Sequence, residues 1–124
     1  MSDGSDDSAR DRYAPENLER FVITLLKRGP NYTTEPSPEL EAQQRAHLDH
    51  LWQQHVAGTL VVMGPVLDDS DIRGFSIYRV ETVEEALRLA EDDPGVKSGR
   101  FVIEAHPWMT HKGILPQRRT ASAE

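Results

Sequence analysis

The sequence predicts an α+β fold in which two helices cover one face of a four-stranded sheet. Four short β-rich apolar runs and two segments with helical periodicity carry this prediction. They follow one another in the order β-α-β-β-α-β, which is the split βαβ pattern of the ferredoxin-like plait. The chain has 124 residues, a length typical of one domain.

The first strand is expected at residues 21–26 (FVITLL), because the run Lys-Arg-Gly-Pro stops it. A helix is expected to begin after Ser37, since a hydroxyl at the N-cap and proline at the first helical position favour a helix start. Gly58 is expected to end this helix. Its predicted core-facing stripe consists of Leu40, Leu48, Leu51, Trp52 and Val56, with Gln44 and His47 in the remaining places.

Two further strands are expected at residues 59–63 and 74–80. Thr82 and Glu85 form a capping-box pattern for a second helix, which the Pro94-Gly95 pair is expected to terminate. The fourth strand is expected at residues 100–105. Both helices then lie on the same sheet face, and the opposite apolar face needs another cover, so we expect a homodimer.

Charge and complexity divide the chain into three parts. Residues 1–19 contain six acidic residues and two arginines, and we expect a disordered acidic leader there. Residues 20–116 hold nearly every large apolar residue and form the single expected domain, and residues 117–124 are an expected flexible tail. The N-terminus lacks the pattern of a signal peptide, and no apolar run approaches the length of a membrane span, so a cytoplasmic protein without a membrane partner is expected.

Composition excludes several function classes. The 14 Lys and Arg residues face 21 Asp and Glu residues, and the formal net charge of −7 disfavours nucleic acid as a partner. The absence of cysteine rules out disulfides, thiolate nucleophiles and cysteine-based metal centres in this chain. No glycine-rich phosphate-binding motif is present, so no nucleotide or other cofactor is expected.

His47 and Asp93 are the leading candidates for chemistry. His47 lies on the core-facing stripe of the first helix, where an imidazole needs a partner. That partner is either a backbone carbonyl, which would make His47 a structural core residue, or a group in a cleft. Asp93 stands where the second helix is expected to end, and Pro94 biases its backbone away from the helix. A His47–Asp93 pair, in which the carboxylate orients a catalytic base, is therefore one of the two interpretations.

Other patterns are weaker. His47 and His50 are spaced three apart, but no third ligand is evident. Asp69 and Asp71 resemble the opening of a calcium loop, but its fifth and twelfth positions, Arg73 and Val80, supply no oxygen ligand, so no metal site is expected. Four basic residues either supply positive charge at the rim of a cleft or are simply solvated: Lys27, Arg28, Lys97 and Arg100.

The chain resembles the YCII-related (YciI-like) domain family over about residues 20–116. The stretches that carry the resemblance are FVITLLKRGP at 21–30, AHL at 46–48 with Leu51, GTLV at 58–61, GPVLD at 64–68, VEEA at 83–86, DDP at 92–94 and HPW at 106–108. This sequence departs from the family pattern in its acidic leader and in Gly95, where an aromatic residue often follows Asp-Pro.

The resemblance implies a dimeric ferredoxin-like α/β barrel with a cleft that holds His47 and Asp93. The expected substrate-binding residues are Arg28, Gly64, Pro65 and Trp108; for Trp108, packing at a dimer seam is the alternative. The family includes a dehydrochlorinase that acts on a chlorinated hydroxyhydroquinone, so an activity of the lyase or isomerase type is implied.

Two functional hypotheses follow. The first is a cofactor-independent enzyme that uses the His47–Asp93 pair for proton transfer or elimination on a small cyclic or aromatic molecule. The second is a non-catalytic dimeric module that binds a small ligand in the same cleft.

Overall fold

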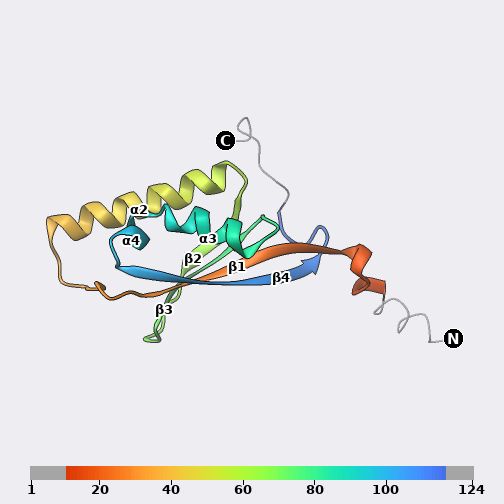
Figure 1. Cartoon of the computed structure of the whole chain (residues 1–124), viewed down its shortest axis with the longest axis horizontal. Helices are drawn as coiled ribbons and strands as arrows, with labels where there is room; N and C mark the ends of the chain where they lie inside the picture. The colour runs from red at the N-terminus through yellow and green to blue at the C-terminus, as the bar shows by residue number, and fades with distance from the viewer. Residues whose placement is uncertain (1–10, 117–124) are drawn as a thin grey trace.

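Four antiparallel strands form one sheet in the order β2-β3-β1-β4, which confirms the α+β class and is consistent with a ferredoxin-like arrangement. The computed structural model describes residues 11–116 (Figure 1). Its elements are a 3-10 turn (Pro15–Asn17), β1 (Leu18–Arg28), α2 (Pro38–Val56), β2 (Leu60–Pro65), β3 (Ile72–Tyr78), α3 (Val83–Glu91), α4 (Pro94–Lys97) and β4 (Phe101–His111).

The predicted helix boundaries are confirmed where a capping residue marks them. The Ser37 hydroxyl accepts a hydrogen bond from the Leu40 amide at the start of α2, and the Thr82 hydroxyl accepts one from the Glu85 amide at the start of α3. Gly58 follows the end of α2 with a φ of 90°, a conformation that glycine adopts without strain.

The second helical segment differs from the prediction. Pro94 and Gly95 do not simply terminate a helix, because α3 ends at Glu91 and Pro94 is the first residue of a third short helix, α4. Proline is well suited to this position, since the first helical N–H needs no intrahelical partner.

The outer strands are longer than predicted. Leu18 and Glu19, expected in the leader, belong to β1, and β4 continues through the His-Pro-Trp segment to His111. Pro107 pairs with Val22 in this ladder, and a proline is tolerated there because β4 is an edge strand. Residues 11–17 of the predicted disordered leader are also described, and they include the 3-10 turn Pro15–Asn17. Residues 1–10 of the leader and the predicted tail, residues 117–124, lie outside the described residues.

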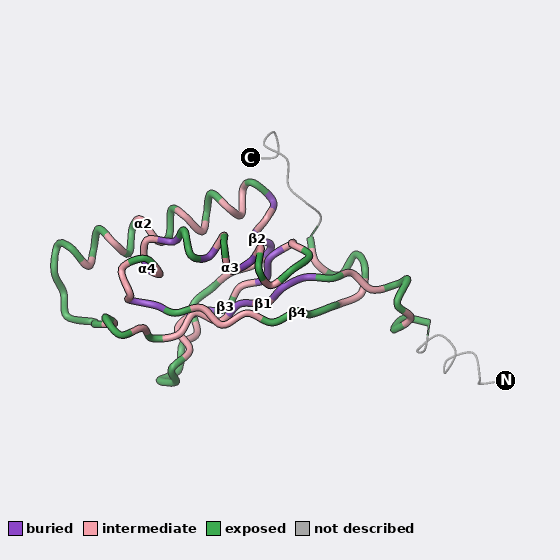
Figure 2. The backbone as a smooth tube through the Cα atoms, viewed as in Figure 1, coloured by how far each residue is buried: buried purple, intermediate pink, exposed green. Residues whose placement is uncertain are grey.

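Helices α2, α3 and α4 lie on one side of the sheet (Figure 1). Beneath them, a core cluster is formed by Val22, Leu60, Tyr78 and Ala86. No residue of α2 is buried, however, and Figure 2 shows the contrast with the buried strands. Leu48 and Trp52, predicted to face the core, are 62% and 53% exposed, because α2 stands away from the sheet and leaves a cleft beneath it.

The opposite face of the sheet carries a second, smaller cluster of Phe21, Val61 and Ile77. No helix in the described part of the chain covers this face (Figure 1). Phe75, Val102, Trp108 and Met109 are 37–49% exposed, and the strand register places the first three on this face. None of the helices within residues 11–116 is both long enough and apolar enough to span a membrane.

The end of β1 is packed tightly against the start of β4. The Gly29 amide donates to the Arg100 carbonyl over 2.7 Å, and the Asn31 amide donates to the Gly99 carbonyl over 2.9 Å. A Cβ atom at residue 29 would overlap the Gly99 carbonyl oxygen and lie 3.0 Å from that of Arg100. Gly29 therefore permits the close approach of two backbone segments.

We expect Gly29→Ala to lower the free energy of unfolding by roughly 1–3 kcal/mol, because both contacts are with backbone that cannot move aside cheaply. Gly64→Ala is the matched control, since a Cβ atom there meets nothing within 4 Å. Chemical denaturation of both variants measures the difference. Equal stability of the two variants would show that the junction is not tightly packed.

Candidate functional site

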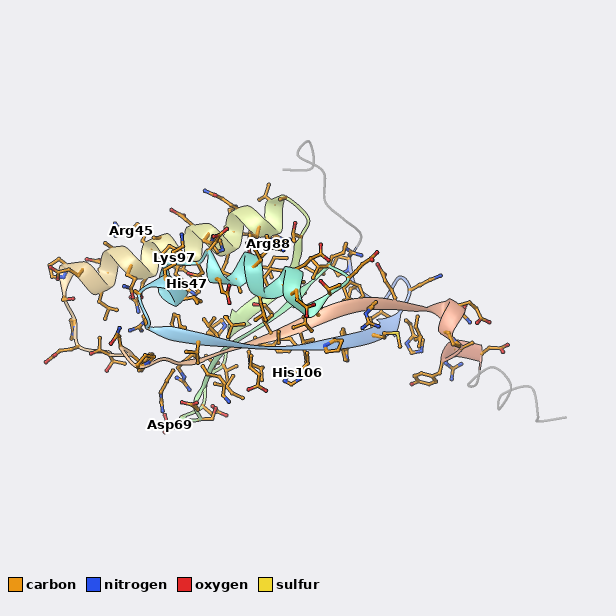
Figure 3. All side chains as sticks on the ribbon, viewed as in Figure 1. Arg45, His47, Asp69, Arg88, Lys97 and His106 are labelled. Carbon is orange, nitrogen blue, oxygen red and sulfur yellow. The ribbon has the colours of Figure 1, made fainter. Side chains whose placement is uncertain are left out.

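His47 projects from α2 toward the sheet and forms a hydrogen bond with Asp93 (Figure 3). The distance from His47 Nδ1 to Asp93 Oδ2 is 2.6 Å, and the two side chains are 14% and 3% exposed. The partner of His47 is thus a carboxylate. The other two histidines of α2 contact backbone carbonyls: His50 contacts that of Leu89, and His55 contacts that of Leu60.

Asp93 is positioned by local sequence. It is the N-cap of α4, with Pro94 at the first helical position, and its backbone is extended at φ −66° and ψ 129°. Its Oδ1 accepts a hydrogen bond of 2.8 Å from the Gly95 amide, which leaves Oδ2 for His47. Both carboxylate oxygens are therefore held, one by backbone and one by the imidazole.

This arrangement determines which ring nitrogen is available. An ionised carboxylate only accepts hydrogen bonds, so His47 Nδ1 carries the proton that it donates to Asp93. His47 Nε2 makes no hydrogen bond to any residue of the described part. A neutral imidazole held in this way presents an unprotonated nitrogen that can accept a proton from a bound molecule.

The pair lies in a cleft of about 840 Å³ between α2 and the sheet. Apolar and aromatic side chains form most of its walls, with His47, Asp93 and Arg100 among the polar groups. Its lining includes Leu26, Tyr32, Leu48, Leu51, Trp52, Met63 and Phe101. A mostly apolar concave surface with a few fixed polar groups is typical of a site for a small molecule.

The other predicted site residues fall into two groups. Gly64 and Pro65, at the end of β2, line the same cleft as His47 and Asp93. Arg28 and Trp108 do not: the Arg28 guanidinium lies 5.5 Å from the centre of the Tyr32 ring, outside the lining, and Trp108 packs against Phe21 on the opposite face of the sheet. The extension of β4 explains the placement of Trp108, because the alternation along the strand sends its side chain away from the helices.

Two aromatic residues of the cleft, Phe101 and Tyr32, were not predicted as site residues from the sequence. The Phe101 ring lies 5.4 Å from the His47 ring and contacts α4 at Gly95, where a Cβ atom would come within 2.8 Å of the Phe101 ring. The absence of a side chain at Gly95 thus makes room for Phe101. Tyr32 lies in the loop after β1, where no periodic pattern marks it.

Tyr78 supplies a neutral hydroxyl at the base of the cleft. It is buried, and its hydroxyl donates a 3.0 Å hydrogen bond to Gln54 Oε1. Burial, and to a smaller extent the negative charge of Asp93, raise the pKa of Tyr78 far above its usual value. Within residues 11–116, no group of three His, Asp or Glu side chains is arranged to hold a metal ion.

The fold and cleft define a small α+β protein with a histidine–carboxylate pair in an apolar site. Residues 21–108 match the family model of the YCII-related domain, and the chain belongs to that family. A similar solved structure is 5-chloro-2-hydroxyhydroquinone dehydrochlorinase from Burkholderia phenoliruptrix AC1100 in complex with 2,5-dihydroxybenzoquinone. The two chains are 28% identical with a TM-score of 0.49, and the match covers 72% of this chain and 92% of the other. The comparison with curated proteins found no match.

The two oxygens of Asp93 predict different effects for two substitutions. Asp93→Ala removes both the cap of α4 and the partner of His47, so we expect the free energy of unfolding to fall by about 1–3 kcal/mol. Asp93→Asn keeps an oxygen for the Gly95 amide, so its free energy of unfolding should fall clearly less than that of Asp93→Ala. Thermal and chemical denaturation test this, with the exposed Asp92→Ala as control. Equal losses in the Ala and Asn variants would contradict the capping role.

Tyr78 predicts a stability loss at alkaline pH. The pKa of Tyr78 is higher in the folded state than in the unfolded state, where it is about 10. The neutral hydroxyl therefore stabilises the folded state fully below about pH 10, and this stabilisation is lost as the pH rises toward the folded pKa. We expect Tyr78→Phe to lose less unfolding free energy between about pH 9 and about pH 11 than the wild type. Tyr13→Phe, at a side chain that is 66% exposed, is the control. Identical pH profiles for the wild type and Tyr78→Phe would refute the prediction.

Proposed function

We propose that the chain is an enzyme that transfers a proton on, or eliminates a leaving group from, a small cyclic or aromatic molecule without a cofactor. His47 is the proposed catalytic base, and Asp93 is its positioning residue. The observation that carries this proposal is the 2.6 Å contact between His47 Nδ1 and Asp93 Oδ2 in the wall of the apolar cleft.

The proposed step uses only groups of this chain. His47 Nε2 accepts a proton from the bound molecule, and the electrons of the broken bond form a new double bond or an enolate. In an elimination, the leaving group departs with its own electron pair. The imidazolium that results is stabilised by the adjacent Asp93 carboxylate, which is already oriented by the Gly95 amide.

The dimensions and lining of the cleft support a small ring-shaped ligand. Its volume of about 840 Å³ lies within the range of small-molecule sites. Trp52 and Leu48 remain more than half exposed at one wall, and the Phe101 ring lies beside the His47 ring at an interplanar angle of 45°. Such surfaces favour the faces of a planar molecule.

The test is turnover of a panel of chlorinated and unchlorinated hydroxyhydroquinones, with and without a ring carboxylate, followed by chloride release and by uptake of solvent deuterium. We expect His47→Asn and Asp93→Asn each to slow the reaction by about 10²–10⁴-fold, since this is the usual contribution of a positioned base. The double variant should be hardly slower than either single variant, because the two residues act as a unit.

His50→Asn is the control, since His50 contacts a backbone carbonyl on the same helix. Rates are normalised to folded protein. Full activity of folded His47→Asn would remove His47 from the mechanism. Tight binding of panel members without any turnover by the wild type would instead identify the chain as a ligand-binding module and overturn the enzymatic proposal.

We also propose that the helix-free face of the sheet binds a second copy of this chain, giving a dimeric barrel. The exposed apolar side chains of Phe75, Val102 and Trp108 support this, because such a surface in water is unfavourable over a continuous area. The same face holds the linked Lys27, Glu104 and His106 side chains, and Figure 3 shows His106 on the side of the sheet opposite His47. Hydrogen bonds from His106 and Lys27 lower the pKa of Glu104 below its usual value.

Sedimentation should give twice the mass of the chain, with an interface burying roughly 1,200 Å² or more in total. Val102→Asp, which introduces a charge on the proposed interface, should shift the equilibrium to monomer. Leu67→Asp is the control, because Leu67 is 90% exposed in the loop between β2 and β3. A monomeric wild type at micromolar concentration would contradict the dimer.

A further inference from the structure

Arg100 is a buried cation without an anionic partner in the described part of the chain. It is 6% exposed, and it forms no ion pair with any residue from 11 to 116. Its Nη1 donates to the Thr33 carbonyl, while Nε is buried without a hydrogen-bond partner and Nη2 has none within the same residues. The guanidinium is therefore only partly satisfied by the protein.

The two other well-covered arginines also have a buried Nε without a hydrogen-bond partner, but each has a carboxylate nearby. Arg79 pairs with Glu19 over 2.6 Å, and Arg73 lies 3.8 Å from an oxygen of Asp68. A charge withdrawn from water is unfavourable unless an opposite charge or several hydrogen bonds compensate it. Arg100 has one carbonyl and two aromatic rings instead: its guanidinium carbon lies 4.6 Å from the Tyr32 ring centre and 5.1 Å from that of Phe101.

Arg100 lines the same cleft as His47. The Phe101 ring connects them, since His47 lies 5.4 Å and Arg100 5.1 Å from it. A planar molecule bound beside His47 Nε2 therefore occupies the same cleft as the Arg100 guanidinium.

The backbone of Arg100 is held firmly. Its carbonyl accepts the Gly29 amide, and the side chain of Asn31 bridges to the Ser98 carbonyl over 2.8 Å. These bonds tie the start of β4 to the loop after β1, so the guanidinium is positioned before any ligand arrives. Such preorganisation increases the affinity that a charged group can contribute.

We propose that Arg100 forms an anion-binding subsite of the cleft and that the ligand is a planar ring bearing a carboxylate. This inference rests on the proposed function only in assigning the ligand to the same cleft. Nη2 and the second N–H of Nη1 form a flat pair of donors that matches the two oxygens of a carboxylate, which a point charge does not reproduce. In the elimination step described above, Arg100 holds the carboxylate and takes no part in the proton transfer.

The test compares benzoate with benzamide, which have similar shape but different charge. We expect an NMR titration of the wild type to show that benzoate binds tighter by roughly tenfold or more, as a charge-assisted bidentate pair predicts. Arg100→Met, which preserves length but removes the charge, should abolish the preference. Arg28→Met should keep it, although Arg28 flanks the same Tyr32 ring from outside the cleft.

A wild-type measurement remains decisive if Arg100→Met does not fold. The Nε–H resonance of Arg100 should shift on addition of benzoate and not of benzamide. Equal affinity for the two compounds, no binding of benzoate, or an unmoved Arg100 resonance would overturn the proposal. The His47→Asn variant separates the two proposals: retained benzoate preference supports the Arg100 subsite whatever the outcome of the turnover test.

Discussion

The hydrogen bond between His47 and Asp93 joins two segments that are 46 residues apart in the sequence, and the cleft is arranged around it. It connects the middle of α2 to the first turn of α4. Because Asp93 also caps α4, the helix start and the orientation of the imidazole depend on the same carboxylate. Phe101 then packs between the ring of His47 and the backbone of Gly95. We therefore expect a change at any of these positions to alter the orientation of the His47 ring.

The sheet serves a different purpose on each face. Toward the helices, Val22 and Tyr78 anchor the core, while Thr24 and Leu26 farther along β1 lie under the cleft. Alternation along the strand sends the neighbouring side chains of β1 to the opposite face, where apolar groups and the Lys27–Glu104–His106 chain remain accessible. Strand β1 therefore contributes side chains to both the candidate site and the proposed interface, on opposite faces of the sheet.

Local signals predicted much of this architecture. The caps at Ser37 and Thr82 are short-range features, and sequence alone was sufficient to place the helices that follow them. The stripe of α2 was misjudged at Leu48 and Trp52, because periodicity identifies an apolar face but not the width of the space beneath it. The face on which Trp108 lies could not be predicted, because it depends on β4 continuing past Pro107. The lack of a carboxylate beside Arg100 could not be predicted either, because it depends on where the acidic side chains lie in the fold; Glu19, for example, pairs with Arg79. Both are properties of tertiary packing.

Neutron diffraction from deuterated crystals at alkaline pH, where a free imidazole is neutral, would locate the proton of the His47–Asp93 hydrogen bond. We expect deuterium on His47 Nδ1, directed at Asp93 Oδ2, and no deuterium on Nε2. Deuterium on Nε2 with a bare Nδ1, or an imidazole turned away from Asp93, would contradict the assignment of His47 as a base oriented by that carboxylate.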